Sequence, residues 1–470
     1  MKFMKDRGFY KLFFTLTFTI ALRNVIVFTV NLADNVMLGS YGPEGIAMSG
    51  VALVNQIQFL LQLMITGACE GAQIFISRAW GASDNATIKK MINLMIRAAL
   101  IIALVAMALV SMFPEGILGL LAEKDDFVAA GTSYLDIIRF SYPIFALTTA
   151  LIVANNSVET VQLGFVTSVG ALIVNVFLNY CLIFGNLGFP EMGVRGAAIA
   201  TLCARCVECL IVVIYTFRID KKIKMHLRDI FTKVDVPLLK DYFRKGFPVF
   251  FSGFIWGVAM TVQLAILGHI GEDGLAVTAN SISNTLFQII TVVTYASASA
   301  AAVMISKVIG EGKPELVRPY ARTFQVLFLC IGIVTSLLIF TFKDVILLAY
   351  KDLTEEAREL ARTFMTILSV TVVATSYQMP CHTGVVRGGG DTAFVFKVDS
   401  IFMWGIVLPA SLVAAFVLKW PPEAVFFVLK CDQIVKCAVA FIKVNSFNWI
   451  KSVGGGEAPA GKARLSNTEE

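Results

Sequence analysis

Apolar runs of roughly 20 residues recur along almost the whole chain, and they limit its fold more than any other feature. A helix of that length spans the apolar interior of a bilayer. Only 15% of the 470 residues are charged and 57% are hydrophobic, whereas soluble domains carry about 25% charged residues. The excess apolar side chains are therefore expected to face lipid, which leaves no part of the chain for a soluble domain.

Twelve apolar stretches predict an all-α integral membrane protein with twelve transmembrane helices. The first run is longer than the apolar part of a signal peptide and lacks a small-residue cleavage site, so we expect it to remain as the first helix. The stretches lie near residues 12–38, 50–76, 92–113, 134–156, 164–185, 195–217, 246–267, 278–306, 321–342, 363–386, 395–417 and 422–442.

Lys and Arg lie mostly in the short connections, and their distribution predicts the orientation of the chain. A cytoplasmic N-terminus places most of them on the inside, as the positive-inside rule requires. We therefore expect a multi-pass protein of the inner (plasma) membrane with both termini in the cytoplasm. The net charge of +6 indicates no nucleic-acid partner, because these charges have no solvated face to lie on.

The two halves of the chain carry an internal repeat. Leu267 lies 229 positions after Leu38, and both begin the pattern Leu-Gly-x-x-Gly-x-x-Gly-x-Ala. The same shift, without a gap, pairs Asn55 with Asn284, Ser77 with Ser306, Arg78 with Lys307 and Gly81 with Gly310. Because six helices separate equivalent positions, the repeat predicts two parallel six-helix bundles around a central cavity. Two such halves can expose one site alternately to each side of the membrane, so a monomer would suffice.

The repeat and the charged connections predict four segments. They are an N-terminal six-helix bundle (1–217), a cytoplasmic linker (218–245), a C-terminal six-helix bundle (246–451) and a cytoplasmic tail (452–470). The tail has too few apolar residues to fold, so we expect it to be disordered.

Asp34 lies in an otherwise apolar span, where a carboxylate costs roughly 2.5–3.5 kcal/mol on insertion scales. An ionised carboxylate at that depth could hold a sodium ion or take up a proton, and its charge state could then bias which side the cavity faces. The alternative is an aspartate at the end of the helix whose side chain reaches the outer surface, since the helix is expected to end near Gly39.

Asn175 and Asn179 are four residues apart, which places two amide oxygens on one face of the fifth predicted helix. There they could complete an oxygen cage for a hard cation, to which Thr201 could add a hydroxyl. The alternative interpretation of the asparagines is hydrogen bonding between helices, typically worth about 0.6 kcal/mol.

Glu70 is the other acid that we identify within an apolar run. It could contact a cationic substrate, or it could pair with an arginine within a span such as Arg23 or Arg139.

Four residues of the seventh and eighth predicted helices are candidates for the wall of a substrate cavity. Gln263 is the position that the repeat pairs with Asp34, and Met260, Asn284 and Gln288 accompany it. Amides and thioethers suit a permissive cavity, although core packing also explains a single methionine.

No pattern points to an enzyme or to ATP as the energy source. The chain has no Walker motif, and its three histidines are dispersed. Cys203, Cys206 and Cys209 have an iron-sulfur spacing, but they lie in a predicted helix. We therefore expect no catalysis, no cofactor and no metal other than a coupling Na+. A scaffold that retained a transporter fold is an alternative, which a functional Asp34 disfavours.

Five motifs that span nearly the whole chain resemble, in order and spacing, those of the multidrug and toxic compound extrusion (MATE) family. They are Asn31-Leu-Ala-Asp-Asn-Val-Met-Leu-Gly39, Ser77-Arg-Ala-Trp-Gly81, Asn175-Val-Phe-Leu-Asn179, Gly193-Val-Arg-Gly-Ala-Ala-Ile-Ala-Thr201 and Arg387-Gly-Gly-Gly-Asp-Thr392. The resemblance implies export of cationic or amphipathic small molecules, coupled to inward flow of Na+ or H+. A lipid-linked oligosaccharide flippase of the same superfamily is the alternative.

The resemblance also implies a cation site formed by Asp34, Asn175, Asn179 and Thr201, and the chain departs from the family around it. Asn179 stands where many family members have aspartate. Thr19 stands where many have a proline that kinks the first helix. The acids that many relatives carry in the seventh and tenth helices are absent from these spans. Ion coupling is therefore expected in the N-terminal half.

Overall fold

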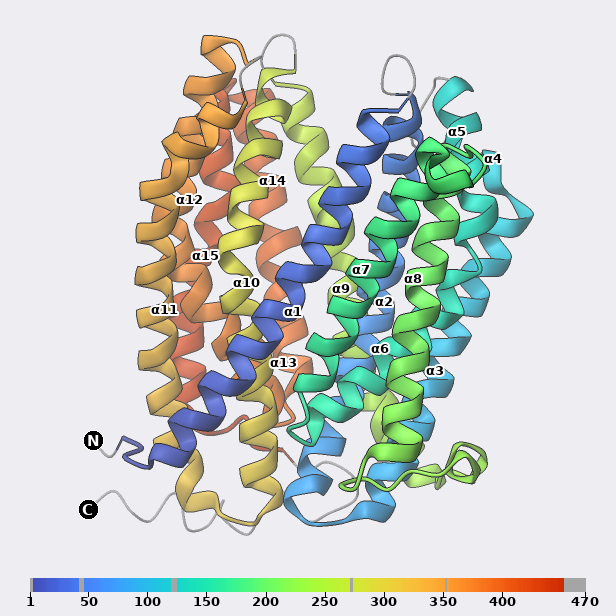
Figure 1. The fold of residues 1–470 in the computed structure, drawn as a ribbon. Coiled ribbons are helices and arrows are strands. Elements are labelled where there is room, and N and C mark those ends of the chain that lie inside the picture. Colours follow the sequence, from blue (N-terminus) through green and yellow to red (C-terminus); the bar gives the residue numbers. More distant parts are fainter. Residues whose placement is uncertain (1–2, 42–45, 120–124, 271–273, 351–352, 452–470) are drawn as a thin grey trace. The chain divides into compact units, whose positions relative to one another are not determined.

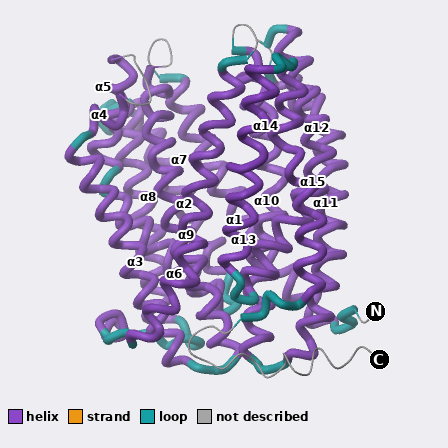
Figure 2. Tube along the Cα trace, turned by 180° about the vertical axis from the view of Figure 1, so that it is seen from behind, coloured by secondary structure: helices purple, strands orange, loops and turns teal. Residues whose placement is uncertain are grey.

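The regular elements of the described residues are all helices, which confirms the predicted all-α fold class (Figures 1 and 2). The structure is a computed structural model. It describes residues 3–41, 46–119, 125–270, 274–350 and 353–451. The predicted disordered tail, 452–470, lies outside these residues.

Each predicted apolar stretch coincides with one long helix or with consecutive helical segments. In the first half these are α1 (Arg7–Gly39), α2 (Ile46–Gly81), α3 (Asn85–Met112), the short α4 (Pro114–Gly119), α5 (Asp125–Ile138), α6 (Ser141–Ser157), α7 (Gln162–Phe184) and α8 (Val194–Ile214). In the second half they are α9 (Val236–Gly268), α10 (Leu275–Gly310), α11 (Pro314–Ala349), α12 (Glu355–Met379), α13 (Thr392–Ser400), α14 (Leu408–Leu412) and α15 (Pro422–Ser446). Wider π-helical turns follow α12, α13 and α14, at Pro380–Val386, Ile401–Val407 and Val413–Val417.

Ten helices of the described residues are long and apolar enough to cross a membrane, and α5 with α6 adds an eleventh span. The twelfth predicted span is α15, which is 25 residues long. It is not among these eleven spans because Lys430, Asp432 and Lys436 lie close together along it. The chain is therefore a multi-pass membrane protein with the predicted number of helices.

The fourth predicted span, 134–156, is not one straight helix. A bend of 56° separates α5 from α6. The break occurs just before Pro143, which lacks an amide hydrogen and whose ring would clash with the carbonyl of Arg139 in a continuous helix. This break was not predicted, because the stretch is apolar on both sides of it.

The chain divides into two compact units. The N-terminal unit comprises Leu22–Trp80 and Asp84–Tyr242, and the C-terminal unit comprises Met1–Ala21, Gly81–Ser83 and Phe243–Glu470. The long helix α1 thus contributes residues to both units, and it is continuous, as expected without a proline at Thr19. The four predicted segments remain predictions, because contact-based units do not establish which segments fold independently.

The internal repeat is visible in the helices themselves. The first residues of α1 and α9, Arg7 and Val236, are 229 positions apart, and so are their last residues, Gly39 and Gly268. The contacts repeat as well. Ser77 Oγ donates to the carbonyl of Ser157 at 3.1 Å in the N-terminal unit, and Ser306 Oγ donates to the carbonyl of Gly388 at 2.8 Å in the C-terminal unit.

The predicted linker is anchored on α3 by polar contacts within the N-terminal unit. Lys89 Nζ lies 2.8 Å from Asp229 Oδ2, and Asn93 Nδ2 donates to the carbonyl of Thr232 at 2.8 Å. Partial burial of the Asp229 carboxyl raises its pKa, but the hydrogen bonds from Lys89 and from the His226 amide, together with the charge of Lys89, lower it by more, so the pKa lies below its ordinary value. The linker is therefore held in a defined place along α3.

The glycine-rich segment before α13 forms a tight turn, and the residues that follow α15 pack on it. Gly389 lies against the fully buried ring of Trp449, and the amide of Lys451 donates to the Gly389 carbonyl at 2.9 Å. Lys443 Nζ pairs with Asp391 Oδ2 at 2.9 Å. A side chain at Gly389 would have to displace the indole.

We predict that Gly389→Ala lowers the free energy of unfolding by about 1–3 kcal/mol, the usual cost of overpacking. The added Cβ would overlap Cε3 of Trp449, and the entropic gain of an alanine, about 0.4–1 kcal/mol, is smaller than this cost. Thermal unfolding of the purified protein in detergent measures the change. Gly405→Ala is the control, because nothing lies within 4 Å of a Cβ there. Equal melting temperatures for both variants would contradict the prediction.

Candidate ion-binding site

The four residues predicted to bind the coupling ion lie together in the N-terminal unit. Asp34 is near the end of α1 and partly buried, Asn175 and Asn179 are one turn apart on α7 and fully buried, and Thr201 is on α8. Asn179 Nδ2 donates to Asp34 Oδ1, and it also donates to Asn175 Oδ1 at 3.2 Å. The carboxylate therefore points into the unit, which favours the ion-site interpretation of Asp34 over the surface one.

Thr201 closes this network. Its hydroxyl accepts a hydrogen bond from Asn175 Nδ2 at 3.3 Å and donates to Asp34 Oδ2 at 3.5 Å. Three helices are thus joined through one carboxylate, two amides and one hydroxyl. The buried Oδ1 of Asn179 has no hydrogen-bond partner among the described residues.

The chemistry of these groups suits a small hard cation or a proton. Carboxylate, amide and hydroxyl oxygens are the ligands that hard cations take. The unpartnered oxygen of Asn179 is a ready ligand, since a buried acceptor without a partner is costly. A proton on Asp34 is the alternative, because a protonated carboxyl can donate to a neighbouring oxygen.

Tyr134, on α5, belongs to the same site, and the sequence did not reveal it. Its side chain is 3% exposed, and its hydroxyl interacts with Thr201 and with the charge of Asp34. A tyrosine at the start of an apolar stretch is typical of packing. The signal available in the sequence was its hydroxyl, which needs a partner when buried.

Glu208, on α8, is a further buried acid. It was not predicted, since only Asp34 and Glu70 were identified as acids within apolar runs. It is 3% exposed and pairs with Arg205 Nη1 at 3.2 Å. The charge of Arg205 also acts on Asp34, and Arg23 of α1 interacts with both Glu208 and Arg205. The candidate site therefore adjoins a set of buried charges. The three-residue spacing of Arg205 and Glu208 on one helix was the signal for it.

Glu70, on α2, is partly buried. The arginines proposed as its partners have acids of their own, since Arg139 pairs with Asp136 at 3.4 Å and Arg23 interacts with Glu208. Its contact with a substrate and its pairing with an arginine both stay predictions.

The other predicted cavity residues lie in the C-terminal unit. Gln263 is buried, donates to the sulfur of Met403 at 3.3 Å and accepts from Lys430 Nζ at 3.5 Å. Asn284 donates to Asn280 at 3.1 Å, Met260 is partly buried, and Gln288 is exposed. Their role in substrate binding stays a prediction.

Buried charge is also present in the C-terminal unit, on two predicted spans whose charged residues were not among the predicted site residues. Lys436 of α15 lies 3.0 Å from Asp432 and 3.4 Å from Asp399 of α13. Asp432 and Lys436 are both almost fully buried. This pairing shows how α15 carries charged residues within an apolar environment.

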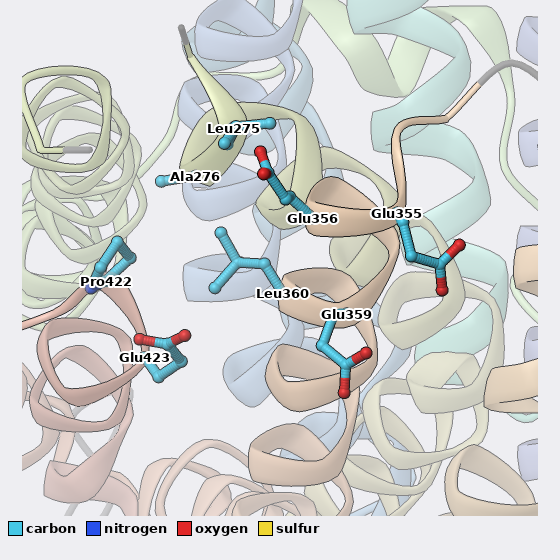
Figure 3. A pocket seen from close by; sticks show the side chains of 8 residues that line it. All are labelled: Leu275, Ala276, Glu355, Glu356, Glu359, Leu360, Pro422 and Glu423. Carbon is cyan, nitrogen blue, oxygen red and sulfur yellow. The ribbon is translucent and has the colours of Figure 1, made fainter. Parts of the chain in front are cut away.

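A cavity of about 470 Å³ lies where the first turns of α10, α12 and α15 meet, and four glutamates line it (Figure 3). Three of them, Glu355, Glu356 and Glu359, are on α12, and Glu423 is on α15. Glu355 is exposed and pairs with Arg358 at 3.0 Å. No residue of the predicted ion site or substrate cavity lines this cavity, so it is not our candidate.

Comparison with known proteins identifies the family of the chain. The MatE family model matches residues 19–181 and 248–413, which is most of both halves. The chain is 25% identical to the "Probable multidrug resistance protein NorM" of Thermotoga maritima, over 83% of this chain and 82% of that one. It is 23% identical to the "Multidrug resistance protein PmpM" of Pseudomonas aeruginosa, over 87% and 84% of the two chains.

The fold is shared with solved structures as well. The Vibrio cholerae MATE transporter VcmN superposes with a TM-score of 0.82 at 17% identity, over 94% of this chain and 98% of that one. The family match covers well over half of the chain, and it includes Asp34, Asn175 and Asn179. The resemblance predicted from the motifs is confirmed, and the chain belongs to the MatE family of transporters.

Proposed function

We propose that this protein exports small organic compounds, cationic or amphipathic, by antiport with Na+ or H+, and that Asp34 carries the coupling ion. The observation that supports this most is the closed network that joins Asp34 of α1 to Asn179 of α7 and Thr201 of α8. A structural role for these side chains alone would not call for a carboxylate among them.

The names of the relatives support export of organic compounds. Those of Thermotoga maritima and Pseudomonas aeruginosa are called multidrug resistance proteins. These names give no support to the flippase alternative. The ion gradient would supply the energy, since each charge that crosses 100 mV is worth about 2.3 kcal/mol.

Ion binding would change how α1 is held. A proton on Asp34 Oδ1 would displace Asn179 Nδ2, which can only donate, whereas a proton on Oδ2 would reverse the bond with Thr201, whose hydroxyl would then accept. A sodium ion would instead draw amide oxygens toward the carboxylate, which requires Asn179 to rotate. Either event rearranges the bonds from α1 to α7 and α8. A transporter needs such a rearrangement to link ion binding to a change in the direction of access.

The position in the C-terminal unit that is equivalent to Asp34 supports ion binding in the N-terminal half alone. Gln263 replaces the carboxylate there, and the ammonium of Lys430 lies 3.5 Å from its oxygen. A resident ammonium repels a second cation. Coupling through the N-terminal half alone remains our proposal.

We predict that Asp34→Asn abolishes ion-driven transport. The amide can neither bind a proton at neutral pH nor supply the negative charge that a sodium ion needs. The measurement is efflux of a fluorescent organic cation from liposomes under an imposed sodium gradient and, separately, a proton gradient. Asp136→Asn on α5 is the control, since Asp136 pairs with Arg139 outside the network.

The wild-type result identifies the ion, because transport should follow only one of the two gradients. Equal transport by wild type and Asp34→Asn would remove Asp34 from the mechanism. If none of the tested compounds moves in the wild type, the flippase alternative regains weight.

We predict a graded effect at Thr201. Thr201→Val removes the hydroxyl that bonds both Asp34 and Asn175, and we expect gradient-driven transport to fall about tenfold, as for one lost hydrogen bond to a charged group. Thr201→Ser keeps the hydroxyl and should retain most activity. The readout is the initial transport rate against ion concentration. Equal rates for the valine and serine variants would show that the hydroxyl has no part in coupling.

A further inference from the structure

The C-terminal unit contains a counterpart of the candidate ion site with different chemistry. Gln263 lies 229 positions after Asp34, and Lys430 lies 229 positions after Thr201. In the N-terminal unit the Thr201 hydroxyl donates to Asp34 at 3.5 Å, and in the C-terminal unit the Lys430 ammonium donates to Gln263 at 3.5 Å. The repeat has therefore kept the contact between the two helices but replaced an acid and a hydroxyl with an amide and a cation.

The ammonium of Lys430 forms no direct ion pair with a carboxylate in the part of the chain that the structure describes. Among the described residues no carboxylate lies within 4.0 Å of its Nζ, although seven other Lys and Arg side chains of the C-terminal unit have one. Its further contact is with the ring of Phe426, whose centroid is 5.5 Å away. An ammonium has three hydrogens to donate, so two remain for another acceptor.

The nearest buried acid is already occupied. Asp432 interacts with Lys430 electrostatically. Its carboxylate, however, is bonded to Lys436 at 3.0 Å and to the amide of Gln433 at 2.9 Å, and its side chain is 1% exposed. Turning it toward Lys430 would break those bonds, which is costly in a buried network.

Gln263 and Met403 together orient the oxygen that Lys430 contacts. The Gln263 amide donates to the Met403 sulfur at 3.3 Å, which leaves its oxygen directed at Lys430. Both side chains are buried, whereas Lys430 keeps part of its surface exposed. An oxyanion that reached Lys430 would thus meet a preoriented donor beside the apolar surfaces of Phe426 and Met403.

We propose that Lys430, positioned by Gln263, binds an anionic group of the transported compound, with a carboxylate as the simplest case. This inference rests on the proposed export function and deepens it. It narrows the substrates to amphipathic organic compounds that carry a negative charge, alone or in a zwitterion.

The test uses two probes that differ in one group, a rhodamine with a free carboxylate and its methyl ester, which lacks the negative charge. Equilibrium binding to the purified protein in uncharged detergent is measured by fluorescence anisotropy. Wild type should bind the carboxylate form more tightly than the ester. Lys430→Gln should weaken binding of the carboxylate form by about tenfold or more, as expected for a charge-assisted hydrogen bond, and should leave ester binding unchanged.

Two further variants separate the charge from the fold. Lys430→Arg should retain the preference for the carboxylate form. Lys443→Gln, the same change on the same helix at a lysine already paired with Asp391, should alter binding of neither probe. Thermal unfolding checks that each variant is folded. A variant that weakens both probes equally, or a wild type that binds both equally, would overturn the proposal.

Binding without a gradient also separates this proposal from the proposed function. Asp34→Asn should keep the preference for the carboxylate form even where it abolishes transport. Loss of the preference on addition of anionic lipid, with no change in ester binding, would assign the site to a lipid headgroup and would also overturn the proposal.

Discussion

In a lipid interior, backbone amides and carbonyls that find no partner in the protein cost several kcal/mol each, and helices are the means by which this chain pairs them. Side chains face the same constraint. The charged and amide groups inside the helices accordingly occur in linked sets, such as Asp34 with Asn179 or Lys436 with Asp432. Polar chemistry is therefore concentrated at a few helix contacts, and those contacts are the places where function can be located.

The two halves use one scaffold for different chemistry. The backbone contacts that shape each half are retained, as Ser77 with Ser157 and Ser306 with Gly388 show. At another equivalent helix contact in each half, a carboxylate faces a hydroxyl in one copy and an amide faces an ammonium in the other. The backbone constrains how the helices pack, whereas the side chains that meet at the same distance in both halves can differ in charge. A duplicated transporter can thus separate the handling of an ion from the recognition of its cargo.

The helices were predictable because apolar length is a local property of the sequence, and the twelve stretches all became helices. The break before Pro143 was missed because the apolar composition continues through it. Asp34, Asn175, Asn179 and Thr201 could be grouped because family motifs carry them. Glu208 and Lys430 were missed for a different reason, since their significance depends on what neighbouring helices present to them. Sequence identifies a buried charge but not the partners that make it functional or inert.

The charges of α15 also affect how this membrane protein is made. A segment that contains Lys430, Asp432 and Lys436 is poorly suited to enter the bilayer alone, because each charge near the centre of a helix costs roughly 2.5–3.5 kcal/mol. Lys436 is stabilised by Asp399, which belongs to the helix synthesised just before it. We therefore expect α15 to leave the translocon together with the span that begins with α13, as a hairpin whose ion pair is already formed. Membrane insertion of α15 then depends on folding, because its contacts with the preceding span must form before the helix is fully exposed to lipid.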